Sequence, residues 1–303
     1  MKLSAPPSLN GFLKRKNIEL SFSRYALKAM SAMAQGLFCT LLIGTILKTI
    51  GTEAGIDFLM SAGSLAQSMA GPAMAAAIGY ALQSPPMVLF TLVPVGFYTN
   101  QLAGAGGPFA VYVVAILASE VGKAVSGETK VDLLVTPAIT LLIGVAVAML
   151  VAIPVASAAS WVGDMIMWGT ELHPFVMGIV VSTLAGMALT LPISSAAICA
   201  GLGLTGLAGG AALAGCCAQM VGFAVMSFPE NRWGGLVSQG IGTSMLQMGN
   251  ILHNPKIWLP PIITSMITGP VATCIFRLEM NGAAVNSGMG TCGFCAPPQD
   301  WLD

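Results

Sequence analysis

Charged residues are scarce in this sequence of 303 residues, and their scarcity decides its class. Lysine, arginine, aspartate and glutamate together make up 8% of the chain, whereas they make up about a quarter of a typical soluble domain. Residues 58–119 and 172–229 contain none of the four. Each stretch is about 60 residues long, and about 20 helical residues cross a bilayer. The sequence is therefore that of a membrane protein whose chain crosses the bilayer several times.

The distribution of charge and apolar residues excludes further classes. The formal net charge is zero and the longest basic tract is Lys14-Arg15-Lys16, so there is no electrostatic footprint for nucleic acid. The apolar runs are unbroken and do not alternate with polar residues as the strands of a membrane β-barrel do. They predict an all-α polytopic membrane bundle of about 8 to 10 segments. Basic residues precede the first apolar run, whereas Glu53 and Asp57 follow it. We therefore expect a multi-pass protein of the cell membrane whose N-terminus lies on the cytoplasmic side.

The seven cysteines give no metal or redox site. Most of them lie in apolar runs, where cysteine behaves as a small hydrophobe. Cys292 and Cys295 have the spacing of a zinc or redox pair, but no second pair accompanies them. We therefore predict no metal and no cofactor.

An ordered set of motifs occurs twice, about 120 to 128 residues apart. The matched pairs are Gly71-Pro72 with Leu191-Pro192, Val95-Gly96-Phe97 with Val221-Gly222-Phe223, and Gly106-Gly107 with Gly234-Gly235. They predict two repeats, residues 54–160 and 172–280, within a transmembrane domain of residues 26–280. An N-terminal segment of residues 1–25 and a C-terminal tail of residues 281–303 flank that domain. Internal symmetry is common in transporters, but chance similarity between glycine-rich and alanine-rich sequences is the alternative.

Prolines inside apolar runs predict broken or re-entrant helices, and one such break carries hydroxyl groups. Pro192 is expected to be the first residue of a half-helix, with Thr190 near its cap and Ser194 and Ser195 in its first turn. Free backbone N–H groups there could hold a sugar hydroxyl or a phosphoryl oxygen. The alternative is that these hydroxyls bond to backbone carbonyls and only bend a helix.

A second candidate site is a polar stripe near the C-terminal end. At helical spacing Thr243, Gln247, Asn250 and Asn254 lie on one face of a helix. Amides supply both donors and acceptors, as a neutral polyol requires. The alternative is hydrogen bonding between helices that only fixes packing.

The third candidate site consists of ionisable groups between apolar runs. The cluster Glu230-Asn231-Arg232-Trp233 and the residue His253 could serve a proton transfer. The more ordinary interpretation is a solvated loop for the cluster and a structural role for the histidine.

Five segments resemble the EIIC-like permeases of the phosphotransferase system of the perfringolysin-regulator (PfoR) type. They are residues 129–137, 189–197, 215–223, 240–247 and 254–258. The resemblance covers roughly residues 26–293. It implies a sugar-translocating membrane subunit that works with separate cytoplasmic phosphocarrier proteins, and it allows a homodimer. Its motifs add Gln219 and Ser244 to the candidate substrate-binding residues.

The leading hypothesis is therefore translocation of a sugar or related polyol, phosphorylated by a partner while it is bound. Glu230 or His253 would orient the accepting hydroxyl as a catalytic group. Substrate would be bound by Thr190, Ser194, Ser195, Gln219, Thr243, Ser244, Gln247 and Asn250. One alternative is an ion-coupled transporter of a small organic anion, with Asp132 or Glu120 as the coupling carboxylate. Another is a membrane sensor that regulates other proteins without transport.

Overall fold

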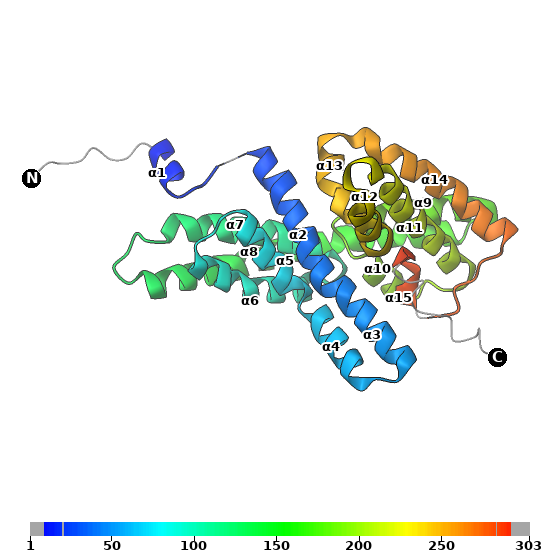
Figure 1. Ribbon diagram of the computed structural model, residues 1–303, viewed down its shortest axis with the longest axis horizontal. Coiled ribbons are helices and arrows are strands. Elements are labelled where there is room, and N and C mark those ends of the chain that lie inside the picture. The colour runs from blue at the N-terminus through cyan, green and yellow to red at the C-terminus, as the bar shows by residue number, and fades with distance from the viewer. Residues whose placement is uncertain (1–8, 20, 283, 292–303) are drawn as a thin grey trace, which may run out of the picture.

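The computed structural model describes residues 9–19, 21–282 and 284–291 and consists of packed helices (Figure 1). Within these residues the only strand-like pairing is an isolated antiparallel bridge between Gly206 and Met280. The first part of the chain contains α1 (Leu9–Arg15), η1 (Ser23–Ala29), α2 (Met30–Leu37), η2 (Phe38–Leu42), α3 (Ile43–Ala54), α4 (Asp57–Ser68), α5 (Ala70–Ala81), α6 (Pro86–Ala103), η3 (Gly104–Gly106), α7 (Gly107–Val125) and α8 (Asp132–Thr170).

The second part contains shorter and more often interrupted elements. They are α9 (Pro174–Thr190), α10 (Ser195–Gly201), α11 (Gly206–Met226), α12 (Phe228–Val237), η4 (Ser238–Gly242), η5 (Ser244–Gln247), α13 (Met248–His253), η6 (Pro255–Trp258), α14 (Leu259–Pro270), η7 (Val271–Ile275) and α15 (Ala284–Ser287). The elements η1, η2, η4 and η7 are π-helical, whereas η3, η5 and η6 are 3₁₀-helical.

The helices form two groups that share one long helix (Figure 1). In the first group α5, α6 and α7 pack on one another, and α6 and α7 pack on α8. In the second group α9, α11 and α14 pack on one another. Helix α8 has 39 residues and is about 58 Å long, so it reaches from the first group to α9 in the second. Helix α2 packs on α5 and also contacts η5 and α13, which ties the groups together.

Large apolar side chains are exposed on the outside of the bundle, where a membrane protein contacts lipid. Leu142, Leu150 and Ile153 on α8 are 68%, 77% and 67% exposed, which an aqueous surface would not favour. Within the described residues, five helical stretches are long and apolar enough to cross a membrane: Ser23–Thr52, Pro86–Val125, Asp132–Thr170, Gly206–Met226 and Pro255–Ile275. The prediction of an all-α polytopic membrane bundle is confirmed. A count of about 8 to 10 segments also needs shorter apolar helices such as α9 to cross, and it stays a prediction.

Glycines allow very close packing in the second group. A Cβ atom on Gly215 of α11 would lie 1.9 Å from the backbone oxygen of Ser182 on α9. One on Gly269 of α14 would lie 2.0 Å from the backbone oxygen of Gly178 on α9. Both distances are shorter than any real Cβ contact, so only glycine permits these crossings.

The helix break near Pro192 is present, but the second half-helix starts later than expected. Helix α9 ends at Thr190, and α10 begins at Ser195 with Ser194 as its N-cap. Leu191 is extended (ψ 157°), as a residue before proline usually is. Ser194 is also extended, and its backbone N–H donates to the carbonyl of Ala105. Pro192 therefore lies in the turn and does not start the helix. The proposed relation between two repeats stays a prediction.

Candidate functional site

The candidate residues fall into three neighbouring places. Glu230, Gln247, Asn250 and His253 line one pocket. Ser194, Ser195 and Thr243 line a second pocket. Thr190, Gln219 and Ser244 are fully buried and hydrogen-bonded to one another. We call these places the polar pocket, the apolar pocket and the buried network.

The polar pocket has a volume of about 380 Å³ and opens beside α12 and α13. Its apolar lining comprises Phe223, Met226 and Ile257. Its polar lining comprises Ser227, Glu230, Asn231, Gln247, Asn250, His253 and Asn254. This combination provides carboxylate, imidazole and amide groups beside apolar side chains, which is the usual composition of a site for a small polar ligand.

Within the polar pocket, two amides are fixed relative to each other. The Asn250 Nδ2 atom donates to Gln247 Oε1 at 2.8 Å, so the Gln247 Nε2 group keeps its hydrogen atoms for a ligand. The predicted stripe is correct for Gln247 and Asn250. Thr243 departs from it, because its backbone is extended (φ −159°, ψ 141°) and a 3₁₀ turn separates it from α13. Its side chain therefore belongs to the other pocket.

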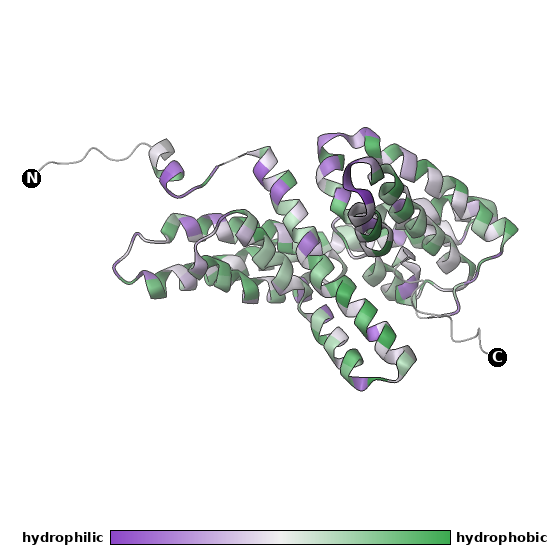
Figure 2. Cartoon of the chain, in the orientation of Figure 1, coloured by the Kyte–Doolittle hydropathy of each residue, from purple (hydrophilic) through white to green (hydrophobic). Residues whose placement is uncertain are grey.

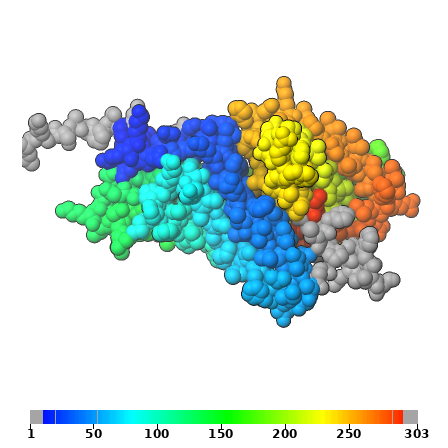
Figure 3. Space-filling model, viewed as in Figure 1, coloured from blue at the N-terminus to red at the C-terminus, as the bar shows by residue number. Residues whose placement is uncertain are grey.

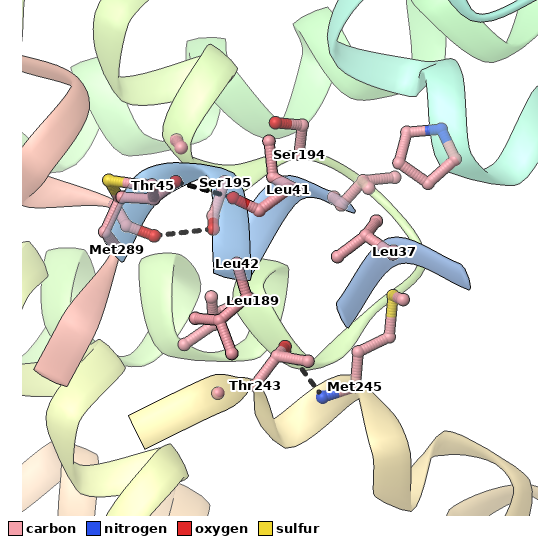
Figure 4. A pocket seen from close by; sticks show the side chains of 15 residues that line it. Leu37, Leu41, Leu42, Thr45, Leu189, Ser194, Ser195, Thr243, Met245 and Met289 are labelled. Carbon is pink, nitrogen blue, oxygen red and sulfur yellow. Dashed lines mark hydrogen bonds between the residues drawn. The ribbon is translucent and has the colours of Figure 1, made fainter. Parts of the chain in front are cut away.

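The apolar pocket lies where segments that are far apart in the sequence meet (Figure 4). Leu37, Leu41 and Leu42 come from the first span, and Met245 and Met289 come from the C-terminal part of the chain. The hydroxyls that line it are already engaged. Ser195 Oγ donates to the carbonyl of Gly288 at 2.7 Å. Ser194 Oγ and Thr243 Oγ1 each accept a backbone N–H, from Ala197 and Met245 respectively.

The buried network joins α9, α11, η5 and α14. The hydroxyls of Thr190 and Ser244 are 2.8 Å apart, and Thr190 Oγ1 also donates to Gln219 Oε1 at 3.3 Å. Trp258 Nε1 donates to the same oxygen at 3.2 Å, and Gln219 Nε2 donates to Ser265 Oγ at 3.4 Å. These side chains use their hydrogen-bonding capacity on each other, as groups that fix helix packing do.

The segment between Thr243 and Gln247 separates the two pockets. Thr243 and Met245 line the apolar pocket, Ser244 bonds into the buried network, and Gln247 lines the polar pocket. A ligand moving between the pockets would therefore pass this segment.

Sequence reasoning missed several members of these sites. Ser265 and Trp258 complete the buried network, and Ser227 lines the polar pocket. The indole of Trp258 in an apolar run was a usable signal, because a buried Trp N–H usually finds an acceptor. The two serines gave no signal, since serine fits many places. Cys292 and Cys295 lie outside the described residues.

The N-terminal segment is held against the turn between α7 and α8. Glu128 accepts from Lys16 Nζ at 2.5 Å and from Arg15 at 2.6 Å. The Lys16 hydrogen bond, with help from Arg15, lowers the pKa of Glu128 below its ordinary value. Lys123 Nζ donates to the backbone carbonyl of Asn17 at 3.1 Å. The residues that precede the first span therefore lie beside the turn that follows α7.

Comparison with known protein families shows which family the chain belongs to. A family model described as Phosphotransferase system, EIIC matches residues 27–299. The chain belongs to this EIIC family. This EIIC chain is accordingly a multi-pass membrane subunit of a phosphotransferase-system sugar transporter, with a sugar as substrate and phosphocarrier proteins as partners. No curated protein and no solved structure matches the chain.

Proposed function

We propose that this EIIC subunit binds its sugar in the polar pocket. The supporting observation is that a carboxylate, an imidazole and two amides, from Glu230, His253, Gln247 and Asn250, line one cavity. A sugar offers hydroxyls as donors and acceptors and an apolar ring face. The amides complement the sugar hydroxyls, and the Phe223 side chain in the pocket lining complements the apolar face of the sugar ring.

Phosphorylation would take place while the sugar occupies this pocket. The oxygen of one sugar hydroxyl attacks the phosphorus atom carried by the partner, and the bond between phosphorus and the carrier's side chain breaks. The hydroxyl proton passes to Glu230 or His253, acting as general base, and the products are the sugar phosphate and the free carrier. Both residues are exposed to the cavity, so a carrier can reach the same space.

The packing favours a pocket that opens to the cytoplasm. Helix α13, which ends at His253, packs on η1 at the start of the first span. The N-terminal segment and the turn after α7 lie at the start of that span as well. The basic residues of these segments are Lys14, Arg15, Lys16, Arg24, Lys28, Lys123 and Lys130. By the positive-inside rule this end faces the cytoplasm, where phosphocarrier proteins reside.

The remaining candidate residues have supporting roles in this scheme, either in the passage of the sugar or in helix packing. Ser194, Ser195 and Thr243 would contact the sugar as it passes through the apolar pocket, and interrupted helices around a site are typical of transporters. Thr190, Gln219 and Ser244 would fix the wall between the pockets. The five quoted motifs favour the PfoR-type branch of the family, and the three pairs of matched motifs favour two internal repeats. We propose both, together with a homodimer.

Ion-coupled transport is the second candidate function, and one observation favours it. Glu120 Oε1 accepts from Lys123 Nζ at 2.8 Å, and its Oε2 atom is buried beside the side chain of Tyr25. Asp132 is a weaker candidate, because its Oδ1 accepts from Gly127 N–H and Thr136 Oγ1 at the start of α8.

The test of the proposed site is phosphorylation of radiolabelled hexoses, each offered singly to membrane vesicles with phosphoenolpyruvate and a soluble extract that supplies the carriers. Glu230→Gln or His253→Gln should lower the rate roughly 10²-fold or more, the usual contribution of a general base. Glu171→Gln, in the exposed turn before α9, is the matched control. Full rates in both pocket variants would refute this assignment.

A further inference from the structure

Helix α12 is an exposed polar and aromatic projection with few contacts to the rest of the bundle. It packs on α11 and on η4. Residues 229–234 are all exposed, and Trp233 is 71% exposed. Figure 2 shows hydrophilic residues concentrated on α12 and α13, in a molecule that is otherwise mostly apolar. In Figure 3 the yellow α12 segment stands forward on the visible face.

The projection nevertheless has a defined shape. Its base is tied by the Asn231 N–H, which donates to the Ser227 carbonyl, and by Gln239 Nε2, which donates to Ser227 Oγ at 2.9 Å. The backbone reverses at Arg232, where φ is 50° and ψ is −144°. Trp233 then packs edge-on against Phe228, with ring centroids 5.7 Å apart. A fixed, exposed tryptophan is a typical anchor of a protein interface.

The same projection forms one side of the mouth of the polar pocket. Glu230 and Asn231 line the pocket from α12, and His253 and Asn254 line it from the opposite side. Arg232 adjoins Asn231, and Lys256 lies two residues beyond Asn254; both cations are exposed. Two exposed cations are therefore chain neighbours of residues that line the pocket, and positive charge there complements an approaching phosphoryl group.

We infer that Arg232, Trp233 and Lys256 form the docking surface for the phosphocarrier protein, with its phosphorylated side chain directed into the polar pocket. This inference rests on the proposed function of the pocket. Phosphoryl transfer requires the accepting oxygen and the phosphorus to lie about 3 to 3.5 Å apart before reaction. The carrier must therefore touch the protein next to the pocket, and these three residues are the exposed cationic and aromatic residues within two positions of its lining.

The experiment measures two Michaelis constants of the reconstituted protein in phosphoenolpyruvate-dependent sugar phosphorylation, one for the phosphorylated carrier and one for the sugar. Trp233→Ala, Arg232→Asn and Lys256→Gln are compared with Trp161→Ala, an exposed tryptophan on α8. Asparagine is used at position 232 because it tolerates the positive φ there. Each docking variant should raise the constant for the carrier roughly tenfold or more and leave the constant for the sugar unchanged, whereas Trp161→Ala should change neither.

The opposite outcome would identify Trp233 as a membrane anchor, because tryptophan also favours the bilayer interface. In that case brominated lipids would quench the fluorescence of Trp233, and the carrier constant would be unchanged in all three variants. This result would overturn the inference. Failure of the proposed sugar site would look different: Glu230→Gln would keep full activity while the docking variants still weakened use of the carrier.

Discussion

Replacing Gln219 by leucine should destabilise the protein and leave sugar recognition intact. Gln219 is fully buried and makes three hydrogen bonds, to Thr190, Trp258 and Ser265. All three are long, between 3.2 and 3.4 Å. Hydrogen bonds between membrane helices contribute about 0.6 kcal/mol each on average, so the loss of three should lower the free energy of unfolding by about 2 kcal/mol.

The three partners of Gln219 would respond differently to its loss. Thr190 keeps its contact with Ser244, and Ser265 Oγ still donates to the carbonyl of Pro261 at 2.9 Å. The indole N–H of Trp258 would lose the Gln219 oxygen, which is its one hydrogen-bond acceptor among the described residues. Most of the destabilisation should therefore come from that stranded donor.

Gln247→Leu is the matched comparison, because it removes the same amide from the polar pocket. Among the described residues, its one side-chain hydrogen bond is to Asn250, three residues further along the chain. Such a local pair stabilises a helix by about 0.2 to 0.5 kcal/mol. The Michaelis constant for the sugar should rise about tenfold, since an amide–hydroxyl contact contributes roughly 1 kcal/mol or more. The assay is unfolding in mixed micelles titrated with dodecyl sulfate, paired with sugar phosphorylation. The reasoning is refuted if Gln219→Leu raises the sugar constant at unchanged stability.

Two further predictions concern packing and charge. Gly215→Ala should prevent stable assembly of α9 and α11, because the added methyl would lie 1.9 Å from a backbone oxygen. Gly163→Ala is the control and should be tolerated, because the nearest atom to its added methyl would lie at 3.5 Å. Thermal unfolding in detergent distinguishes the two variants. Since the pKa of Glu128 is lowered, its stabilising contact with Lys16 is complete above the ordinary value of 4.5 and is lost as the pH falls below it through the lowered pKa. Hydrogen-exchange protection of α1 should therefore decrease as the pH falls below 4.5, and Glu128→Gln should show low protection already at pH 7. Unchanged protection in that variant would contradict this account.

Composition was enough to predict the fold class, because long apolar runs without charge leave few options but membrane helices. The break at Pro192 was also predictable, since proline ends a helix. The exact start of the next helix at Ser195 was not, because it depends on a tertiary contact between the N–H of its N-cap, Ser194, and the carbonyl of Ala105. No local pattern in the sequence reports such a contact.

The grouping of the polar stripe in space was predictable in part, and the departure from it has one physical source. Gln247, Asn250 and Asn254 share a pocket as their spacing indicates. Thr243 does not, because a π-helical segment precedes it and a 3₁₀ turn follows it, so the assumed period of about 3.6 residues fails there. Polar type alone could not separate Gln219, which is used in packing, from Gln247, which faces a cavity.

The most direct test of the central claim is uptake by proteoliposomes that contain this protein, with the chemical form of the accumulated sugar identified. The account predicts that sugar accumulates only as its phosphate and only when phosphoenolpyruvate and the phosphocarrier proteins are supplied. A proton or sodium gradient alone should give no concentrative uptake. Accumulation of unmodified sugar driven by such a gradient, and abolished by Glu120→Gln, would contradict the account and establish ion-coupled transport.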